Sequence, residues 1–569
     1  MRGPEHIYER TGVRPRHTAP LVSPVSEDTL VASRPDVPEP PPRPRHRLAF
    51  SAAIFSVGTA LSRVAGLARD IIAASFFGTT AAASAFTFAY QIPNLVAGLF
   101  AQAALSAAFV PVFSELLQKG RKRDAFRLAS SLFWIILIGL GAITALMIAF
   151  AGAIMPLFTG SSFSAADNAL TAGLAQVLFP VVLLLGLTGL LVGILQAFEE
   201  FTMPAMAPVV WNIVIIVLLV VLRPRFHGHL GIYAFAVAWL VATGVQFALV
   251  ASALRRVDFR LQFSIDWGDP RVRQVFALML PVTIGLGIVN LDQLLNSAFG
   301  SLVSTQAPSA IDRAFRVYML PQGMFSVAIT TVLFPTLSRL AVLRDATGMR
   351  RTVGNGMRQI GLLLIPCTAL LIVLVTPITR LVYQRGTFTA HSTHLVSTAL
   401  FWFAFSLPFA GINLLLSRCF FAVKKPWIPT RLAALNMIVD VIVSIALYKP
   451  LGIAGLVIGT AVANAVMTWL QFTRLRRGLR GRLDGRQTLM ITMRILVAAA
   501  ISAAAARGIW VGLDDLLGRG LIAEIIAVGI SLLLAAAIYA KLVLVMKIPE
   551  ARQIEQLVKG RFARPRPAH

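Results

Sequence analysis

Long apolar stretches recur along the chain from Leu48 to Met546 and are separated by short polar loops. A helix needs about 20 mostly apolar residues to cross a bilayer, so this pattern predicts an all-α polytopic membrane protein. About fourteen transmembrane helices are expected, at approximately residues 48–77, 81–112, 126–156, 168–197, 204–222, 229–254, 272–300, 310–338, 356–383, 394–422, 428–447, 451–473, 489–511 and 520–546. Prolines that fall inside spans predict broken helices at Pro93, Pro180, Pro281, Pro321 and Pro366.

The composition supports a membrane protein and argues against a nucleic-acid partner. The chain is 57% hydrophobic and 14% charged, whereas soluble domains carry about 25% charged residues. Its net charge of +27 would suggest nucleic acid in a soluble protein. Here the basic residues lie in short loops between apolar runs, where they orient a membrane protein. No nucleic-acid binding is expected.

The distribution of lysine and arginine predicts the orientation. Loops on one side are basic, as in KGRKRDAFR (119–127) and RLRRGLRGR (474–482), whereas FGTT (77–80) and SLVSTQAPSA (301–310) on the other side have no Lys or Arg. Basic loops stay in the cytoplasm, so both termini are expected there. Arginines in the outer loops 223–229 and 383–389 are exceptions that do not reverse the balance.

The two ends of the chain are polar. Residues 1–46 are rich in Pro and Arg and lack the apolar core of a signal peptide, so we expect a disordered cytoplasmic tail. Residues 547–569 are expected to form a basic cytoplasmic tail. Cys367 and Cys419 lie in apolar segments and show neither metal-ligand spacing nor a disulfide framework.

The sequence contains an internal repeat with an offset of 222–225 residues. FVPVFSEL (109–116) aligns with LFPTLSRL (333–340). A set in the first span also aligns with one in the seventh: Asp70, Ser75, Phe77 and Gly78 match Asp292, Ser297, Phe299 and Gly300. Six spans per copy is an even number, so both copies enter the membrane in the same direction, and a site is expected between them. The predicted units are an N-lobe (48–256), a C-lobe (271–477) and two additional helices (488–546).

Four arginines fall inside predicted spans, where charge is costly and usually functional. Arg63 and Arg69 lie in the first span. Arg313 and Arg316 lie in the eighth, three residues apart and therefore on one helix face. Guanidinium groups bind phosphate oxygens in a bidentate manner, so one interpretation is an anion clamp. The alternatives are snorkelling to the membrane surface and pairing with aspartates of the same spans.

A second polar cluster is acidic and amide-rich. Asn436 and Asp440 share a face of the eleventh span, Thr460 lies on the twelfth, and Asp292 and Asn296 lie on the seventh. Oxygen ligands of this kind suit a hard monovalent cation or a proton, and the alternative is polar packing between helices. No catalytic constellation or nucleotide-binding loop appears, so the chain is not expected to be an enzyme.

Several segments resemble the MurJ (MviN) family. They include SRVAGLARDIIAASFFG (62–78), FTFAYQIPNLVAGLFAQAALSAAFVPVFSEL (86–116) and RVYMLPQGMFSVAITTVLFPTLSRLA (316–341). The likeness runs from about Leu48 to Arg477. It implies the fold of the multidrug/oligosaccharidyl-lipid/polysaccharide exporter superfamily and a place in the bacterial inner membrane. Family members flip lipid II, the undecaprenyl-diphosphate-linked peptidoglycan monomer, from the inner to the outer leaflet.

The resemblance also implies roles for particular residues. The positions that match the family's diphosphate-binding cavity are Arg63, Arg69 and Arg316, with Asp70, Asn94 and Arg313 as further candidates. The positions that match a sodium site known in some members are Asn436, Asp440 and Thr460, with Asn296 or Asp292 from the seventh span. No cofactor is expected, and the coupling ion would be Na⁺ or H⁺. The two additional helices resemble those that form a groove for the lipid tail.

The expected partners are membrane lipid and lipid II, and the cytoplasmic tails could contact the cell-wall synthesis machinery. The chain departs from the family pattern at Ser84, Ala97, Gln102 and Phe315, where members often carry charged residues. These departures leave open a flippase for another polyprenyl-diphosphate-linked glycan. A cation-coupled drug antiporter would prefer acidic residues in the N-lobe, and a glycosyltransferase would need a large outer loop.

Overall fold

The computed structural model describes residues 45–99, 102–226, 228–257, 259–479, 485–518 and 520–552. All regular secondary structure in these ranges is helical, which confirms the predicted all-α class. Most of the two predicted tails, including residues 1–44 and 553–569, lies outside the described residues.

The helices of the first half begin with the long α1 and end with α9. Their bounds are α1 (Arg45–Phe77), α2 (Ala81–Leu99), α3 (Gln102–Gln118), α4 (Lys122–Ala149), α5 (Ala151–Ile154), α6 (Ala165–Leu178), α7 (Pro180–Ala197), α8 (Thr202–Leu222) and α9 (Tyr233–Ala253). The second half continues with α10 (Pro270–Val303), α11 (Ala307–Pro321), α12 (Val327–Val342), α13 (Ala346–Val373), α14 (Val375–Tyr383), α15 (Ala390–Ala422), α16 (Trp427–Leu451) and α17 (Ile453–Gly478). The last two helices are α18 (Gly485–Leu517) and α19 (Leu521–Val545).

Twelve segments among the described residues are long and apolar enough to cross a membrane, and they correspond to the third to fourteenth predicted spans. The first two predicted spans are helical, as α1 and as α2 with α3, but they are not among the twelve. The predicted count of fourteen is therefore not confirmed.

The proline prediction holds at two of its five positions. Pro180 separates α6 from α7, and Pro321 ends α11 before a π-helical turn at Gln322–Ser326. The prediction of a break is wrong at Pro93, Pro281 and Pro366, which lie inside the continuous helices α2, α10 and α13. A proline removes a single backbone hydrogen bond, and packed neighbouring helices can accommodate that loss in a membrane.

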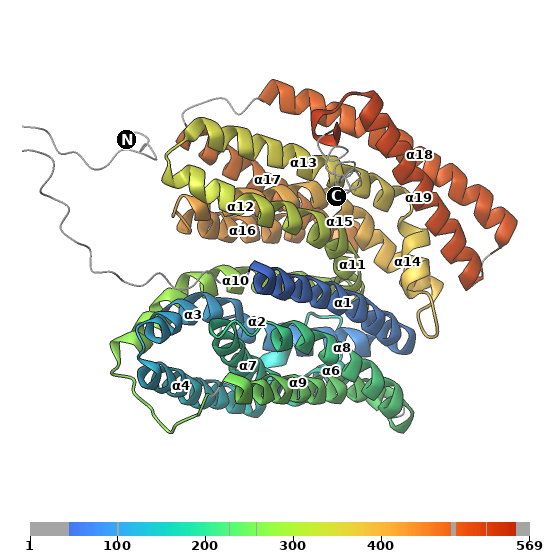
Figure 1. Ribbon diagram of the computed structural model, residues 1–569. Coiled ribbons are helices and arrows are strands. Elements are labelled where there is room, and N and C mark those ends of the chain that lie inside the picture. The colour runs from blue at the N-terminus through green and yellow to red at the C-terminus, as the bar shows by residue number, and fades with distance from the viewer. Residues whose placement is uncertain are drawn as a thin grey trace, which may run out of the picture.

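The helices form two bundles that face each other (Figure 1). Helices α1–α9 make one bundle, and α11–α17 make the other. Helix α1 packs on α8, whereas α10 contacts α2 and α3 of the first bundle as well as α16 of the second. Helices α18 and α19 pair with each other along the outer edge, against α13. The lobe boundaries 48–256 and 271–477 remain predictions, and the name lobe is used below for the two bundles.

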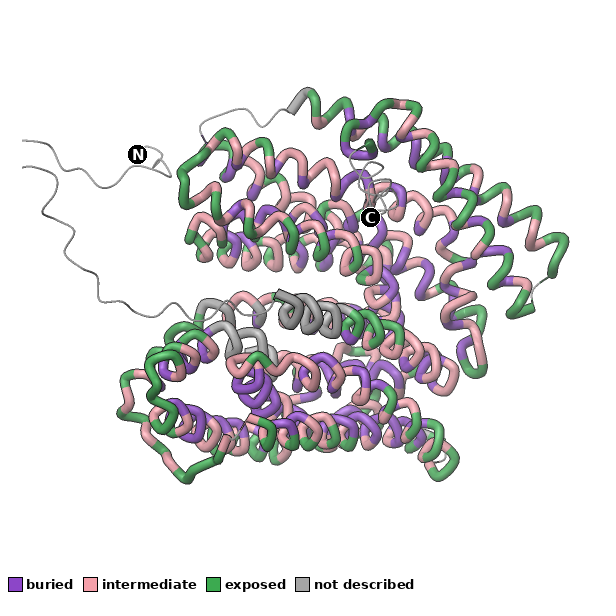
Figure 2. The backbone as a smooth tube through the Cα atoms, in the orientation of Figure 1, coloured by how far each residue is buried: buried purple, intermediate pink, exposed green. Residues whose placement is uncertain are grey.

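Buried residues line the inside of both bundles, and exposed residues lie mainly on their outer surfaces and loops (Figure 2). Large apolar side chains remain exposed on the outside, including Val332 and Leu533, which are 75% and 72% exposed. A soluble protein would bury such residues, but lipid tails are as apolar as leucine. The outer surface is therefore suited to contact with the bilayer.

Candidate functional site

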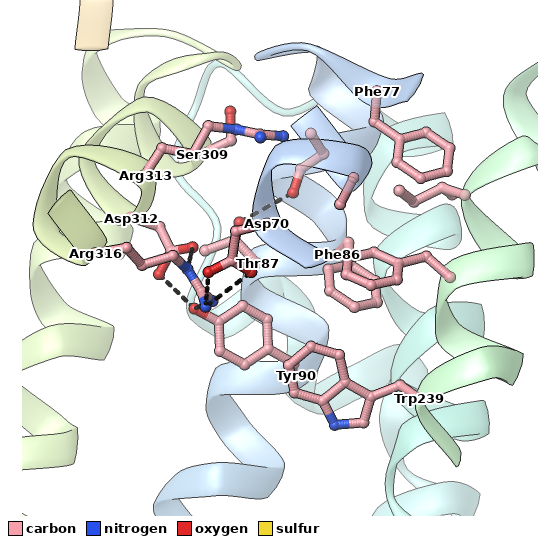
Figure 3. A pocket seen from close by; sticks show the side chains of 14 residues that line it. Asp70, Phe77, Phe86, Thr87, Tyr90, Trp239, Ser309, Asp312, Arg313 and Arg316 are labelled. Carbon is pink, nitrogen blue, oxygen red and sulfur yellow. Dashed lines mark hydrogen bonds and ion pairs between the residues drawn. The ribbon is translucent and has the colours of Figure 1, made fainter. Parts of the chain in front are cut away.

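Four polar side chains meet where α1, α2 and α11 come together (Figure 3). Arg316 Nη1 lies 3.2 Å from Asp70 Oδ2, and Arg316 Nε lies 2.9 Å from Asp312 Oδ2. Arg316 Nη2 also donates a hydrogen bond of 3.0 Å to the hydroxyl of Tyr90, which in turn donates to Asp312. Arg316 thus joins its own C-lobe carboxylate to a carboxylate of the N-lobe. This pairing was one of the alternatives left open by the sequence.

Arg69 occupies a different environment, inside the N-lobe. Its Nη2 lies 2.8 Å from Asp70 Oδ1, and its guanidinium lies 5.0 Å from the rings of both Trp211 and Trp239. Only 6% of the residue is exposed. Arg69 does not line the cavity that Arg63 and Arg316 share. Its predicted contact with a diphosphate remains a prediction, and its observed partner is Asp70.

A cavity of about 350 Å³ lies between the lobes next to Arg316. Its lining includes Arg63, Asp70 and Asn94 from the N-lobe and Asp312, Phe315 and Arg316 from the C-lobe. No ion pair joins Arg63 to any residue whose side chain the structure describes. The cavity therefore presents two arginines from opposite lobes, one of which has no carboxylate partner among the described residues.

Arg313, the neighbour of Arg316 on the same helix face, points away from this cavity. Its Nη2 donates a 2.6 Å hydrogen bond to the carbonyl oxygen of Gly78 in the N-lobe. Its guanidinium also lies 5.9 Å from the ring of Tyr383 and 5.7 Å from that of Phe388. Arg313 thus fastens the lobes together at the loop that follows α1.

Further contacts between the lobes lie at the same end of the molecule, in or next to the loops that carry few Lys and Arg residues. These hydrogen bonds are Thr79 Oγ1 to Ser392 Oγ (2.7 Å), Thr387 N to Ser75 O (2.9 Å) and Ser309 N to Ser84 Oγ (3.2 Å). The lobes are therefore joined over the cavity at the end that the charge pattern predicts to be external.

The second predicted cluster surrounds Asp440, which is buried. Asn296 Nδ2 and Thr460 Oγ1 donate hydrogen bonds of 2.9 and 3.2 Å to its Oδ2. Asp292 lies next to the same carboxyl group. The Oδ1 atom of Asn436 is buried without a partner among the described residues. The structure thus brings together the five residues that were predicted from three separate spans.

Most atoms that this cluster could offer to a cation are oxygens. The Oδ1 atom of Asn436, which has no partner among the described residues, could bind a cation directly. Such a donor set fits a hard monovalent cation. Ser444, whose hydroxyl donates to Asp440 over 3.2 Å, was missed by the sequence analysis. It lies four residues after Asp440 on the same helix face, so its spacing could have revealed it. Whether a cation binds here remains a prediction.

Two of the four departures from the family pattern have a described environment. Ser84 is buried, and its hydroxyl accepts a hydrogen bond from the backbone nitrogen of Ser309, so it contributes to the contact between the lobes. Phe315 packs against Tyr318 and Phe403 at the cavity wall. The side chains of Ala97 and Gln102 lie outside the described residues.

The two N-lobe arginines should differ in their effect on stability. We expect Arg69→Gln to lower the melting temperature of the purified protein, because the charged hydrogen bond to Asp70 and the contacts with two indole rings are lost together. The loss should be about 1.5–3 kcal/mol for the hydrogen bond alone. Arg63→Gln is the control and should leave the melting temperature unchanged. Equal melting temperatures for both variants would contradict the structural role of Arg69.

Comparison with known proteins places this arrangement in a family. Residues 73–523 match the family described as lipid II flippase MurJ. The lipid II flippase MurJ of Burkholderia cenocepacia is 29% identical over 74% of this chain and 82% of its own. The probable lipid II flippase MurJ of Rhizobium tropici is 30% identical over 84% of this chain and 90% of its own.

Solved structures share the fold. A lipid II flippase MurJ in an inward closed conformation superimposes with a TM-score of 0.72 at 23% identity and covers 87% of this chain and 99% of its own. An inward-facing multidrug resistance MATE transporter of the MOP superfamily gives a TM-score of 0.62 at 15% identity, over 74% of this chain and 94% of its own. With a family match that spans most of its length, the chain belongs to the lipid II flippase MurJ family.

Proposed function

We propose that this protein, a multi-pass protein of the bacterial inner membrane, carries lipid II from the inner to the outer leaflet by alternating access. The observation that carries the proposal is the cavity that Arg63 and Arg316 line from opposite lobes. The lobes are joined over it at the end with few basic residues. The activity is transport across the membrane rather than catalysis.

The two arginines suit a diphosphate. Arg63 has no carboxylate partner among the described residues, and the side chain of Arg316 keeps 26% of its surface exposed although it is paired. Guanidinium forks bind phosphate oxygens through paired, charge-assisted hydrogen bonds. A diphosphate in this cavity would be held from both lobes at once, so its binding would be coupled to their relative position.

The ion pairs explain how the lobes could separate at low cost. Arg316 bridges Asp70 of the N-lobe and Asp312 of the C-lobe. If the lobes part here, Arg69 still neutralises Asp70 and Asp312 still neutralises Arg316. An unpaired buried charge is strongly destabilising, and this arrangement leaves none on either side. The ion pair between Arg316 and Asp70 can therefore break when the lobes separate and form again when they close.

The membrane potential favours the proposed direction. When the cytoplasm is negative, each negative charge that moves outward gains about 2.3 kcal/mol per 100 mV. To the extent that the arginines neutralise the charge of the diphosphate, the membrane potential contributes less free energy to this step. The cluster around Asp440 could hold Na⁺ or a proton, which would supply a second gradient to the cycle.

The substrate class is tested by binding. The purified protein should bind lipid II and undecaprenyl diphosphate, and should bind undecaprenyl monophosphate more weakly, because the second phosphate is the group that reaches the second arginine. Arg63→Gln should weaken lipid II binding by at least about tenfold. If only lipid II binds, the glycan headgroup and not the two arginines determines the specificity. Equal binding of all three lipids would contradict the diphosphate assignment.

Gly323 permits the position of Arg63. It lies in the π-helical turn of the C-lobe, and a Cβ atom placed on it would come within 2.5 Å of Arg63 Nη1. We expect Gly323→Ala to displace the guanidinium and to weaken lipid II binding several-fold, with little change in melting temperature because the Arg63 side chain can move. Gly285→Ala is the matched control, since a Cβ there meets nothing within 4 Å. Unchanged binding by the Gly323 variant would show that Arg63 does not contact substrate at this position.

The proposed direction requires that the joined end of the lobes faces outward. A cysteine at Ser304 should therefore react with an impermeant maleimide in intact cells, and one at Arg123 should react only after the membrane is permeabilised. Both substitutions are made in a background without Cys367 and Cys419. The reverse labelling pattern would invert the orientation and with it the direction of transport.

A further inference from the structure

The segment between the lobes is extended and runs along the surface of α4 (Figure 1). We call residues 260–267 the strap. It links the 3₁₀ turn that follows α9 to the start of α10, and it contains no helix up to the turn at 267–268. An extended segment alternates its side chains between two faces, and the strap uses its two faces differently.

Three residues of the strap contact α4: Gln262 through its backbone, and Ser264 and Asp266 through their side chains. Ser130 Oγ accepts a hydrogen bond of 3.0 Å from the backbone nitrogen of Gln262, and Trp134 Nε1 donates one of 3.0 Å to the carbonyl oxygen of Gln262. The hydroxyls of Ser264 and Ser131 lie 3.1 Å apart. The strap is therefore fastened to the side of a helix that is long and apolar enough to cross the membrane.

One further contact of this face fixes the direction of the strap. Asp266 lies 3.6 Å from Arg127, near the start of α4. The strap therefore runs from Trp134 back toward the basic end of α4 and follows about two turns of that helix, from Trp134 to Arg127. At about 1.5 Å per residue, Trp134 lies about 18 Å along the helix from Lys122.

The odd-numbered residues of the strap are apolar and largely exposed. Leu261, Phe263, Ile265 and Trp267 are 46%, 79%, 49% and 57% exposed. Phe263 makes an edge contact with the ring of Trp134 at 5.1 Å but leaves most of its surface uncovered. Figure 2 shows this part of the tube mainly as exposed. Four large apolar side chains in a row on one face need a partner.

The charged residues at both ends of the strap indicate what covers its apolar side chains. Arg255, Arg256 and Arg260 precede the apolar residues and are exposed, and so is Arg273 after them. A row of apolar and aromatic side chains flanked by arginines matches the boundary of a bilayer that contains anionic lipid. The extended backbone also fits this boundary rather than the hydrocarbon centre, where its unpaired amide groups would have no water.

We propose that the strap is a lipid-anchoring element: its apolar face inserts into the membrane boundary at the basic end of α4, and its flanking arginines bind the headgroups of anionic phospholipid. The strap would then move with the N-lobe, to which α4 belongs. The relative movement of the lobes would be taken up after Trp267. This inference does not depend on which lipid-linked substrate the protein carries.

Spin labels test the insertion. Cysteines are placed one at a time at positions 263–265 in a background without Cys367 and Cys419, and the protein is reconstituted in bilayers that contain phosphatidylglycerol. We expect labels replacing Phe263 and Ile265 to collide with oxygen and to be shielded from a water-soluble nickel chelate. A label replacing Ser264, whose hydroxyl lies 3.1 Å from that of Ser131, is the matched control and should be poorly accessible to both reagents.

If the nickel chelate reached a label at position 263 as readily as a label at position 123, the strap would lie in water and the proposal would be overturned. Dipolar broadening between labels at position 263 would also overturn it, since a second copy of the chain would then cover the strap. The headgroup contact has its own measurement in the Arg255→Gln/Arg256→Gln/Arg260→Gln variant. In this variant, the enrichment of phosphatidylglycerol over phosphatidylcholine among the lipids bound to the protein should fall by about fivefold per arginine removed. Unchanged enrichment would overturn the headgroup assignment.

Discussion

We expect the Arg316→Ala protein to reach the membrane at normal levels and to flip no lipid II. The substitution removes the C-lobe half of the proposed clamp and the pair that links Arg316 to Asp70 of the N-lobe. Loss of one charge-assisted hydrogen bond, worth about 1.5–3 kcal/mol, corresponds to roughly 10- to 150-fold weaker lipid II binding. Folding should survive, because Asp70 keeps Arg69 and Asp312 keeps the hydroxyl of Tyr90.

Two further variants separate the effect of charge from that of geometry. Arg316→Lys keeps the charge but loses the planar fork, so we expect partial flipping at most. Arg225→Ala removes an exposed arginine whose guanidinium donates a hydrogen bond to the carbonyl oxygen of Val221, four residues earlier, and this variant should flip normally. Flipping is measured as lipid II exposed on the outer leaflet at matched protein levels. Full activity of Arg316→Ala would show that Arg316 is not part of the clamp.

A disulfide between the lobes should stop transport reversibly. Thr79 Oγ1 and Ser392 Oγ lie 2.7 Å apart and belong to opposite lobes, so cysteines at these positions can approach bonding distance with small side-chain movements. Oxidation of Thr79→Cys/Ser392→Cys should abolish flipping, because alternating access requires this end to open. Reduction should restore it.

The single-cysteine proteins are the controls for this cross-link. Thr79→Cys and Ser392→Cys alone should keep their flipping activity under oxidation, since neither can tie the lobes together. If the cross-linked protein, verified by its mobility on a gel, flipped at the normal rate, the lobes would not need to separate at this end. The alternating-access account would then be wrong.

Much of the fold could be predicted because each span carries its own signal. A run of about 20 apolar residues identifies a membrane helix without knowledge of its neighbours, and twelve of the predicted spans appear as such in the described residues. Prolines were less informative, because whether a helix breaks depends on what packs beside it. Pro366 lies in an unbroken α13, whereas Pro321 precedes a π-helical turn.

The candidate site could be predicted only in part. Spacing and resemblance found Arg63 and Arg316, which line one cavity, and the residues that surround Asp440. Neither could show that Tyr90 bridges Arg316 and Asp312, because that contact joins segments more than 200 residues apart. The two indole rings beside Arg69 were missed because Trp211 and Trp239 lie more than 140 residues further along the chain.

Complementation tests the central claim most directly. The chain is expressed in a host whose own lipid II flippase is depleted, and lipid II on the outer leaflet is measured by its accessibility to an impermeant probe. We predict that outer-leaflet lipid II returns with the wild-type chain and not with Arg316→Ala at equal membrane levels. Failure of the wild-type chain to restore outer-leaflet lipid II, although it is present in the membrane and the host's own flippase restores it, would contradict the account.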